Sequence, residues 1–340
     1  MLYPFSLIYG SVIMLRNFLF NKNIFKSASF NFPIICVGNL ATGGTGKTPM
    51  TEYLIELLQK KYEVATLSRG YKRKTKGFAI ANERTTALEI GDEPMQFHQK
   101  YPNITVAVGE ERIVAIPQIL QDKPNCDVII LDDGFQHRTV KAGLNIVLTD
   151  FSNLYTRDLL LPAGDLRDIK KSISRANIIV VTKCKKDLSV IERRSIEKEF
   201  NLLPTQQLFY SEILYAPPIH LYTGNATSID TNTDVLLITG IASPKTLKNF
   251  IAKNANSYDM LKYADHHIFN SGDLRDIKKH FEKLNSTKKI IITTEKDGVR
   301  LKKFERELSE MPIYVLPIKL RFLFDEKIFN KKVLEFVQSF

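Results

Sequence analysis

The chain has 340 residues, of which 44% are hydrophobic and 25% charged, and its formal net charge at pH 7 is +11. This composition excludes a mainly disordered chain, and three scattered cysteines argue against a disulfide framework or a zinc site. The positive charge indicates an anionic partner: nucleic acid, a phosphorylated metabolite or an acidic membrane surface.

The first predicted element is an apolar segment at residues 2–20, which serine, glycine and Arg16 interrupt. A transmembrane helix needs about 20 mostly apolar residues and a secretion signal needs a basic region before its apolar stretch, so both are disfavoured. Two interpretations stay open. The segment is either a helix that packs on the domain core or, as we favour, an amphipathic helix in a membrane interface, with Arg16, Lys22 and Lys26 at the level of the lipid headgroups.

Residues 31–181 alternate short apolar runs with helical patterns, which predicts βαβ units around a parallel sheet. Uninterrupted apolar runs of this kind are typical of strands buried on both faces. The predicted strands are residues 33–37, 64–67, 105–108, 127–131, 145–148 and 178–181.

A glycine-rich turn, Gly43-Gly-Thr-Gly-Lys-Thr48, lies between the first of these strands and a predicted helix at 49–60. A strand, a glycine turn and a helix start in this order are the context of a phosphate-binding loop, although Ala41 stands where the strict pattern has glycine. The glycines let backbone N–H groups converge on phosphate oxygens, Lys47 neutralises the β- and γ-phosphates, and the Thr48 hydroxyl is a ligand for Mg²⁺. The predicted nucleotide-binding residues are Thr42, Gly43, Gly44, Thr45, Gly46, Lys47, Thr48 and Pro49.

The strand at 127–131 runs directly into two carboxylates, Asp132 and Asp133. Acidic residues at the carboxyl end of a strand beside a phosphate-binding loop form a Walker B arrangement. We therefore expect one of the two to ligate Mg²⁺ or to order a water bound to it.

A second, smaller set of elements follows, with strands at 234–238 and 289–292 and helices at 244–254 and 271–284. Broken strand-like segments at 207–222 and 312–318 flank it. The predicted fold class is therefore α/β, with a P-loop NTPase parallel-sheet domain and a smaller α/β domain joined by a two-stranded β linker. The predicted boundaries are 1–26 for the interfacial helix, 27–206 for the P-loop domain, 207–318 for the smaller domain with its linker strands, and 319–340 for a C-terminal helix whose docking partner stays open.

Three further segments carry polar side chains whose role is ambiguous in isolation. Gly91-Asp-Glu-Pro94 offers either a helix cap or a general base for a substrate hydroxyl. Asp265-His-His267 either orients a base or forms a loop cluster with satisfied hydrogen bonds. The turn at 161–168 carries charges of both signs, which alone is typical of a solvated loop.

Taken together, these segments resemble the tetraacyldisaccharide 4'-kinases of lipid A biosynthesis, a membrane-associated family that moves the γ-phosphate of ATP to the 4'-hydroxyl of a lipid-linked glucosamine disaccharide. The resemblance covers nearly the whole chain and is most specific in Asp132-Asp-Gly-Phe-Gln-His137. The other matching segments are Val37–Asn39, Gly43–Pro49, Ser68–Tyr71, Gly91–Pro94, Leu160–Asp168, Asp265–His267 and Thr294–Asp297.

The resemblance implies ATP and Mg²⁺ as cofactors and a base, Asp92, which a histidine assists. His266 is favoured for that histidine and His267 is the alternative. The residues predicted to be catalytic are Asp92, His266, Lys47 and Asp133, and the predicted metal set is Thr48, Glu93, Asp132 and Asp168. Two positions depart from the family, because Asp168 stands where members usually have glutamate and Asp165 where they usually have proline.

The sequence therefore predicts an ATP-dependent kinase for a tetraacyl glucosamine disaccharide 1-phosphate, the lipid A precursor. We expect a monomer, bound peripherally to the cytoplasmic side of the bacterial inner membrane, that uses no nucleic acid. Because Asp92 and His266 fall in different predicted domains, we also expect the domains to close during catalysis. The alternative is a membrane-associated partitioning-type ATPase, which has a similar loop but carries an extra lysine where Thr42 stands.

Overall fold

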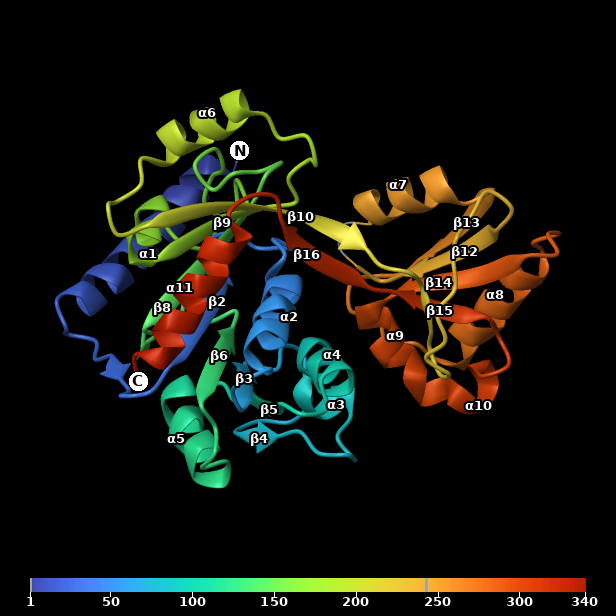
Figure 1. Cartoon of the computed structure of the whole chain (residues 1–340), viewed down its shortest axis with the longest axis horizontal. Helices are drawn as coiled ribbons and strands as arrows, with labels where there is room; N and C mark the ends of the chain where they lie inside the picture. Colours follow the sequence, from blue (N-terminus) through green and yellow to red (C-terminus); the bar gives the residue numbers. More distant parts are fainter. Residues whose placement is uncertain (1, 242–243) are drawn as a thin grey trace. The chain divides into compact units, whose positions relative to one another are not determined.

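The computed structural model describes residues 2–241 and 244–340, which form two compact units (Figure 1). The first unit comprises Met1–Ile213 and Leu320–Phe340, and the second comprises Leu214–Lys319. Both units are α/β with mainly parallel sheets, which confirms the predicted class.

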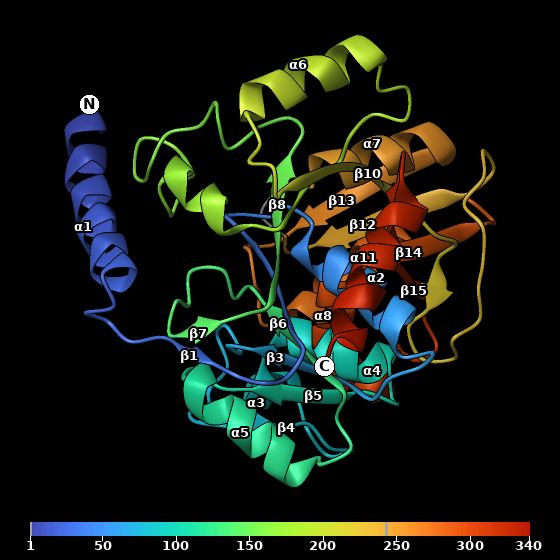
Figure 2. The same ribbon diagram turned by 60° about the vertical axis from the view of Figure 1, so that its left-hand side comes forward.

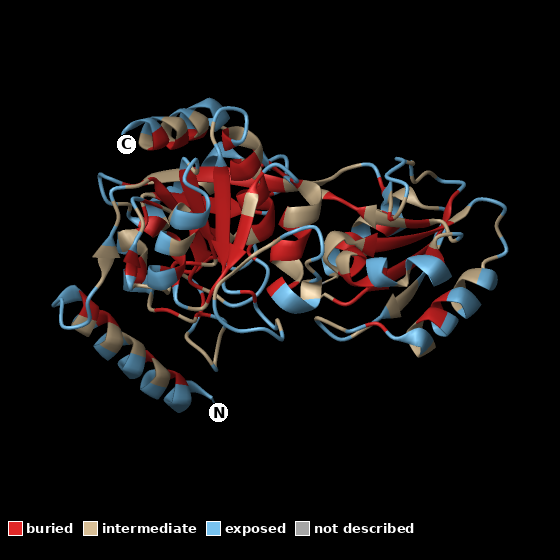
Figure 3. Ribbon diagram, turned by 90° about the horizontal axis from the view of Figure 1, so that it is seen from below, coloured by how far each residue is buried: buried red, intermediate tan, exposed pale blue. Residues whose placement is uncertain are grey.

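The first unit is built on a nine-stranded sheet with the strand order β16-β10-β9-β8-β2-β6-β3-β5-β4. The strands are β2 (Ile34–Asn39), β3 (Val64–Ser68), β4 (Ala79–Ile80), β5 (Thr105–Val108), β6 (Val128–Asp132), β8 (Leu144–Asp150), β9 (Ile178–Thr182), β10 (Gln207–Tyr215) and β16 (Ile318–Phe322). The neighbours from β10 through β9, β8, β2, β6 and β3 to β5 pair in parallel, whereas β4 is antiparallel to β5. The central strands β2, β3, β6 and β9 are buried along their whole length, as Figure 3 shows in red.

Helices cover this sheet, and a small two-stranded sheet of β1 (Ala28–Ser29) and β7 (Val140–Lys141) lies apart from it. The helices of the first unit are α1 (Tyr3–Asn21), α2 (Lys47–Leu58), α3 (Ala87–Ile90), α4 (Asp92–Lys100), α5 (Arg112–Asp122), the 3-10 helix η1 (Lys170–Arg175), α6 (Val190–Phe200) and α11 (Glu326–Gln338). Helix α6 was not predicted from the sequence, because it is polar and buries only Ile196 and Phe200.

The second unit has a five-stranded sheet in the order β11-β15-β14-β12-β13. Its strands are β11 (Ile219–His220), β12 (Asp234–Thr239), β13 (Ser257–Lys262), β14 (Lys289–Thr294) and β15 (Ile313–Leu316), and its helices are α7 (Lys245–Asn254), α8 (Ser271–Glu282), α9 (Glu295–Leu301), the 3-10 helix η2 (Lys302–Phe304) and α10 (Glu305–Leu308). Apolar clusters on the two faces of β12 and β14 form its core. All eight predicted strands of the two units are strands in the structure, and their ends differ from the predicted ones by at most two residues.

The C-terminal helix α11, whose partner the sequence left open, lies beside α2 in both Figure 1 and Figure 2. The Phe329 ring lies 5.8 Å from the Tyr53 ring on α2, 5.4 Å from Phe209 and 4.4 Å from Phe322. The Tyr53 hydroxyl also contacts Glu326 on α11 at 2.8 Å. The last helix of the chain thus supports the helix that follows the glycine-rich loop.

Truncation of Phe329 should test this support. Since Phe329 is fully buried among three aromatic rings, Phe329→Ala should lower the free energy of unfolding by about 3–5 kcal/mol. Its neighbour Ile328 is 52% exposed, so Ile328→Ala is a matched control with little expected effect. Chemical denaturation of both variants measures the difference, and equal stabilities would show that α11 is not docked through this ring.

The N-terminal helix α1 has an unusual distribution of side chains. Its buried residues are Ser6, Gly10, Asn17 and Phe20, whereas most of its large apolar side chains are more than half exposed. Among the helices that the structure describes, none is long and apolar enough to cross a membrane.

Candidate active site

The glycine-rich loop between β2 and α2 has the backbone geometry of a ligand-binding turn. Gly43 and Gly46 have φ angles of 89° and 90°, which glycine adopts without strain. Gly46 is also the N-cap of α2, and no side chain caps the helix there. Side chains added at Gly43 or Gly44 would meet no atom within 4 Å, so internal packing does not require these glycines. The open loop and the uncapped N–H groups of α2 therefore suit an anionic ligand.

Lys47, in the first turn of α2, lies close to Asp133 just beyond β6. Its Nζ is 3.8 Å from Asp133 Oδ1, and Arg167 donates to both carboxylate oxygens of Asp133. Burial opposes ionisation of Asp133, but the two cations outweigh it and hold the pKa of this carboxyl below its usual value. Asp133 is therefore an ionised bridge between Lys47 and Arg167.

Asp132, the last residue of β6, is buried and accepts a hydrogen bond from Thr51 Oγ1 at 3.1 Å. Burial, together with the neighbouring charges of Glu93 and Asp133, raises the pKa of Asp132 to about 7. Glu93 Oε1 lies 3.5 Å from Thr48 Oγ1. Two carboxylates and a hydroxyl thus converge beside the loop. The positive charge of Lys47 is too small to offset the effect of burial on the pKa of Asp132.

This donor set fits a magnesium ion that also binds phosphate. In residues 2–241 and 244–340 there is no group of three or more His, Cys, Asp or Glu side chains that could hold a metal alone. Mg²⁺, however, is usually held by one or two carboxylates together with substrate phosphates and water. Thr48, Asp132 and Glu93 offer that sparse set of oxygen ligands.

Asp92 and Glu93 occupy the first turn of α4, where negative charge is favoured. The N-cap of α4 is Gly91 and it forms no side-chain cap, so neither carboxylate serves as the cap that the sequence left open. Gln96, one turn further along, donates to Glu52 of α2 at 2.8 Å. The helix that carries Asp92 is thereby tied to the helix that follows the loop.

His266, in the second unit, is held by a chain of hydrogen bonds through Arg300 and Asp297. Arg300 Nη2 lies 3.0 Å from His266 Nδ1, and Arg300 Nη1 donates to Asp297 at 3.1 Å. Asp297 in turn accepts from the Gly240 N–H at 3.0 Å. Because a guanidinium group only donates, His266 Nδ1 is the acceptor, and the neutral ring therefore carries its proton on Nε2.

His267 has different surroundings. Its Nε2 contacts Asp273 at 2.9 Å, and its ring stacks on Tyr263 at 4.7 Å. These contacts give His267 a structural role within its own unit.

Comparisons with known proteins identify the family. Residues 1–338 match the sequence model of the family described as tetraacyldisaccharide-1-P 4'-kinase. The chain belongs to this family. The tetraacyldisaccharide 4'-kinase of Phocaeicola vulgatus is 47% identical over 99% of this chain and 95% of that protein, and the one of Flavobacterium johnsoniae is 45% identical over 99% and 97%.

The fold of a solved member of the tetraacyldisaccharide-1-P 4'-kinase family also matches. The crystal structure of LpxK from Aquifex aeolicus in complex with ATP superimposes with a TM-score of 0.77 and 27% sequence identity, covering 99% of this chain and 98% of that chain. The chain is therefore a kinase of the family that acts in lipid A biosynthesis.

Within this family member, Asp168 lies in surroundings that differ from those of a metal ligand. Its Oδ1 accepts from Asn17 Nδ2 at 3.0 Å, from Ser172 Oγ at 2.7 Å and from its neighbour's backbone N–H, and its Oδ2 pairs with Arg175 at 3.1 Å. The side chain is 1% exposed. Because protein donors surround both oxygens, we withdraw Asp168 from the predicted metal set and assign it to the attachment of α1.

Three polar residues that contact predicted site residues within their own units had no role in the sequence prediction. Arg167 pairs with Asp133, Arg300 orients His266, and Thr182 Oγ1 donates to the backbone oxygen of Thr45 in the glycine-rich loop at 2.8 Å. Arg300 follows Asp297 by three residues, a spacing that brings side chains together on a helix. That spacing is the one sequence pattern from which a contact of any of these three residues could have been predicted.

Proposed function

We propose that this kinase transfers the γ-phosphoryl group of ATP to the 4'-hydroxyl of a tetraacyl glucosamine disaccharide 1-phosphate, the lipid A precursor. The observation that carries the proposal is the convergence of the glycine-rich loop, Lys47 and the carboxylates of Asp132 and Glu93, beside a helix that presents Asp92. The names of the similar enzymes and the ATP in the Aquifex aeolicus complex support the choice of acceptor and donor.

In the proposed mechanism, the loop N–H groups and Lys47 hold the β- and γ-phosphates while Asp92 accepts the proton of the sugar hydroxyl. Thr48, Asp132 and Glu93 would hold Mg²⁺, which when bound neutralises charge on the phosphates. Asp133 restrains Lys47 on one side and Arg167 on the other. Positioning and charge stabilisation account for most of the rate enhancement in phosphoryl transfer, so the chain contributes mainly geometry.

His266 is assigned the role of assisting Asp92. Its Nε2–H is a donor that suits a carboxylate, because Arg300 fixes the proton on that nitrogen. Closure of the two units during catalysis stays a prediction from the sequence. Distances between labels on the two units that are equal with and without nucleotide and acceptor would contradict it.

We further propose that α1 lies in the cytoplasmic interface of the inner membrane, where a multiply acylated acceptor resides. Phe5, Ile8, Val12 and Leu15 are each at least 60% exposed and are spaced three or four residues apart, so they form an apolar stripe on one face of the helix. The formal charge of +11 suits an anionic leaflet. The proposed enzyme is a peripheral monomer that binds no nucleic acid.

Replacing Phe5, Ile8 and Leu15 together with serine should release the protein from membranes. Each large side chain removed from lipid costs about 1.5–3 kcal/mol, so sedimentation with liposomes of mixed neutral and anionic lipid should fall at least tenfold. Ile191→Ser is the control, since Ile191 is an exposed apolar residue on α6. Unchanged sedimentation of the triple variant would refute the interfacial position of α1.

The position of the transferred phosphate tests the proposed reaction. The purified kinase is incubated with ATP, Mg²⁺ and a tetraacyl disaccharide 1-phosphate in mixed micelles, and phosphorus–proton correlation NMR then locates the new phosphate. We expect it on the 4' oxygen. A product phosphorylated elsewhere, or no product from a protein that binds ATP, would overturn the proposal.

A further inference from the structure

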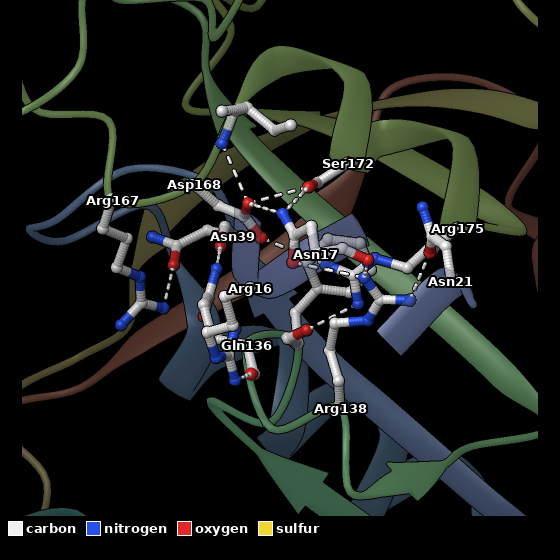
Figure 4. A network of polar contacts seen from close by, with 12 residues as sticks. Arg16, Asn17, Asn21, Asn39, Gln136, Arg138, Arg167, Asp168, Ser172 and Arg175 are labelled. Carbon is white, nitrogen blue, oxygen red and sulfur yellow. Dashed lines mark hydrogen bonds and ion pairs between the residues drawn. The ribbon is translucent and has the colours of Figure 1, made fainter. Parts of the chain in front are cut away.

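The face of α1 that meets its own domain is joined to it by specific polar contacts (Figure 4). The contacts are those of Ser6 Oγ with the Leu160 oxygen at 2.9 Å, Tyr9 OH with the Arg167 oxygen at 3.0 Å, Arg16 Nη2 with the Gln136 oxygen at 2.7 Å and Asn17 Nδ2 with Asp168 Oδ1 at 3.0 Å. An anchor that serves only to hold lipid needs no such contacts. Two of the targets, Arg167 and Asp168, moreover donate their backbone N–H groups to the oxygen of Leu40, in the segment that leads into the glycine-rich loop.

One route from α1 passes through Gln136. Arg16 donates to the backbone oxygen of Gln136, and the side-chain amide of Gln136 donates to the backbone oxygen of Asn39 at 2.7 Å. Asn39 is the last residue of β2, directly before the loop. Two hydrogen bonds therefore connect Arg16 to the end of that strand, so a shift of Arg16 would also move Asn39.

A second route passes through residues 167 and 168. Tyr9 holds the backbone of Arg167, and Asn17 holds the side chain of Asp168. The Arg167 side chain then donates to the Oδ1 atom of Asn39 as well as to Asp133. Figure 4 shows Arg167 and Gln136 on either side of Asn39.

Both routes end at a residue that holds the loop. Asn39 is fully buried, and its Nδ2 donates to Thr45 Oγ1 at 2.8 Å. Thr182, at the end of β9, donates to the backbone oxygen of Thr45. A change in the position of Asn39 therefore displaces Thr45, two residues before Lys47.

We propose that α1 is a positioning element of the phosphate-binding loop: Tyr9, Arg16 and Asn17 act through Gln136 and Arg167 on Asn39, so that attachment of the helix sets the affinity for nucleotide and the rate of transfer. The inference rests on the proposed function in that the loop binds ATP. It assigns a role to Asn39 as the residue where the two routes meet.

The test uses the full chain and α1 variants that keep the exposed apolar stripe. Arg16→Leu combined with Asn17→Ala removes one contact from each route and should lower ATP affinity, measured without acceptor, roughly tenfold, because a buried hydrogen bond left unmade costs about one power of ten. Arg16→Lys keeps a donor and should restore most of the affinity in the Asn17→Ala background. Ser11→Ala, whose hydroxyl contacts only the backbone of α1 itself, is the matched control.

A double-mutant cycle distinguishes coupling from loose attachment. If Arg16 acts through Asn39, the loss in ATP affinity for Arg16→Leu should largely disappear in an Asn39→Ala background. Independent, multiplicative losses would overturn the proposal, and so would a folded protein with Arg16→Leu and Asn17→Ala that keeps wild-type ATP affinity and kcat. Thermal melts separate both results from unfolding.

The outcome is independent of the acceptor. Because ATP binding is measured without lipid, α1-dependent affinity in a protein that phosphorylates no disaccharide would uphold this inference and sink the proposed function. If the protein phosphorylates the disaccharide but the α1 variants keep wild-type ATP affinity, the proposed function would stand and this inference would be wrong.

Discussion

Replacing Asp92 with alanine is expected to lower the rate of phosphoryl transfer by about 10²–10⁴-fold while nucleotide binding persists, since a positioned general base contributes that much to a proton transfer. Asp92 lies in the first turn of α4, and α4 is tied to α2 through Gln96 and Glu52. The change removes the acceptor for the hydroxyl proton and leaves the glycine-rich loop intact. Transfer and ATP affinity are measured on the same preparation.

Asp122→Ala is the matched control for this variant, because Asp122 is an exposed carboxylate at the end of α5 in the same unit. It should leave transfer and affinity unchanged. An Asp92→Ala enzyme with near wild-type transfer would show that another group takes the proton. Loss of ATP binding in that variant would instead show that Asp92 supports the nucleotide site.

The second large effect is expected at Lys47. Lys47→Met keeps the length of the side chain and removes its charge, so negative charge that develops on the phosphates loses a fixed cation, and the rate should fall about 10²–10³-fold. Asp133 also loses one of its two cationic neighbours, which should raise its pKa. Steady-state kinetics should show a fall in kcat that exceeds the change in KM for ATP.

Lys185→Met is the control for charge removal, since Lys185 forms an exposed pair with Glu192. It should behave as wild type. A Lys47→Met enzyme that changes KM for ATP but not kcat would mean that Lys47 binds the ground state and the transition state equally. That outcome would contradict its assignment as a catalytic residue.

The strands and the glycine-rich loop were accessible from the sequence because both are local patterns. Each buried strand of the first unit is a continuous apolar run, and the loop has its glycines and Lys47 within six residues. The structure adds the φ angles that make Gly43 and Gly46 necessary. Local sequence patterns were therefore enough to predict the buried strands and the glycine-rich loop of the first unit.

The surroundings of Asp168 were not predictable in this way. Its hydrogen-bond partner Asn17 is 151 residues away in the chain, and no local pattern links the two. The family resemblance placed Asp168 with the metal ligands, whereas tertiary structure surrounds it with Asn17, Ser172 and Arg175. The same limit applies to Arg300, which contacts His266 across 34 residues.

The orientation of α1 was also open from the sequence alone. An apolar helix is expected to turn its large side chains toward a core, yet this one buries Ser6, Gly10 and Asn17. Gly10 lets the helix approach Leu160 closely, because a β-carbon there would lie 2.8 Å from the end of that side chain. Ser6, Gly10 and Arg16, which interrupt the apolar segment, thus lie where the helix is attached.

The destination of the γ-phosphoryl group tests most directly whether the protein is a lipid-sugar kinase. The kinase is supplied with γ-labelled ATP and a lipid A disaccharide precursor in mixed micelles, and the label is followed into lipid and into inorganic phosphate. We expect label in the lipid with wild-type protein and its loss with Asp92→Ala. Label found only in inorganic phosphate would identify a hydrolysing ATPase, such as a partitioning-type protein, and would contradict a lipid-sugar kinase.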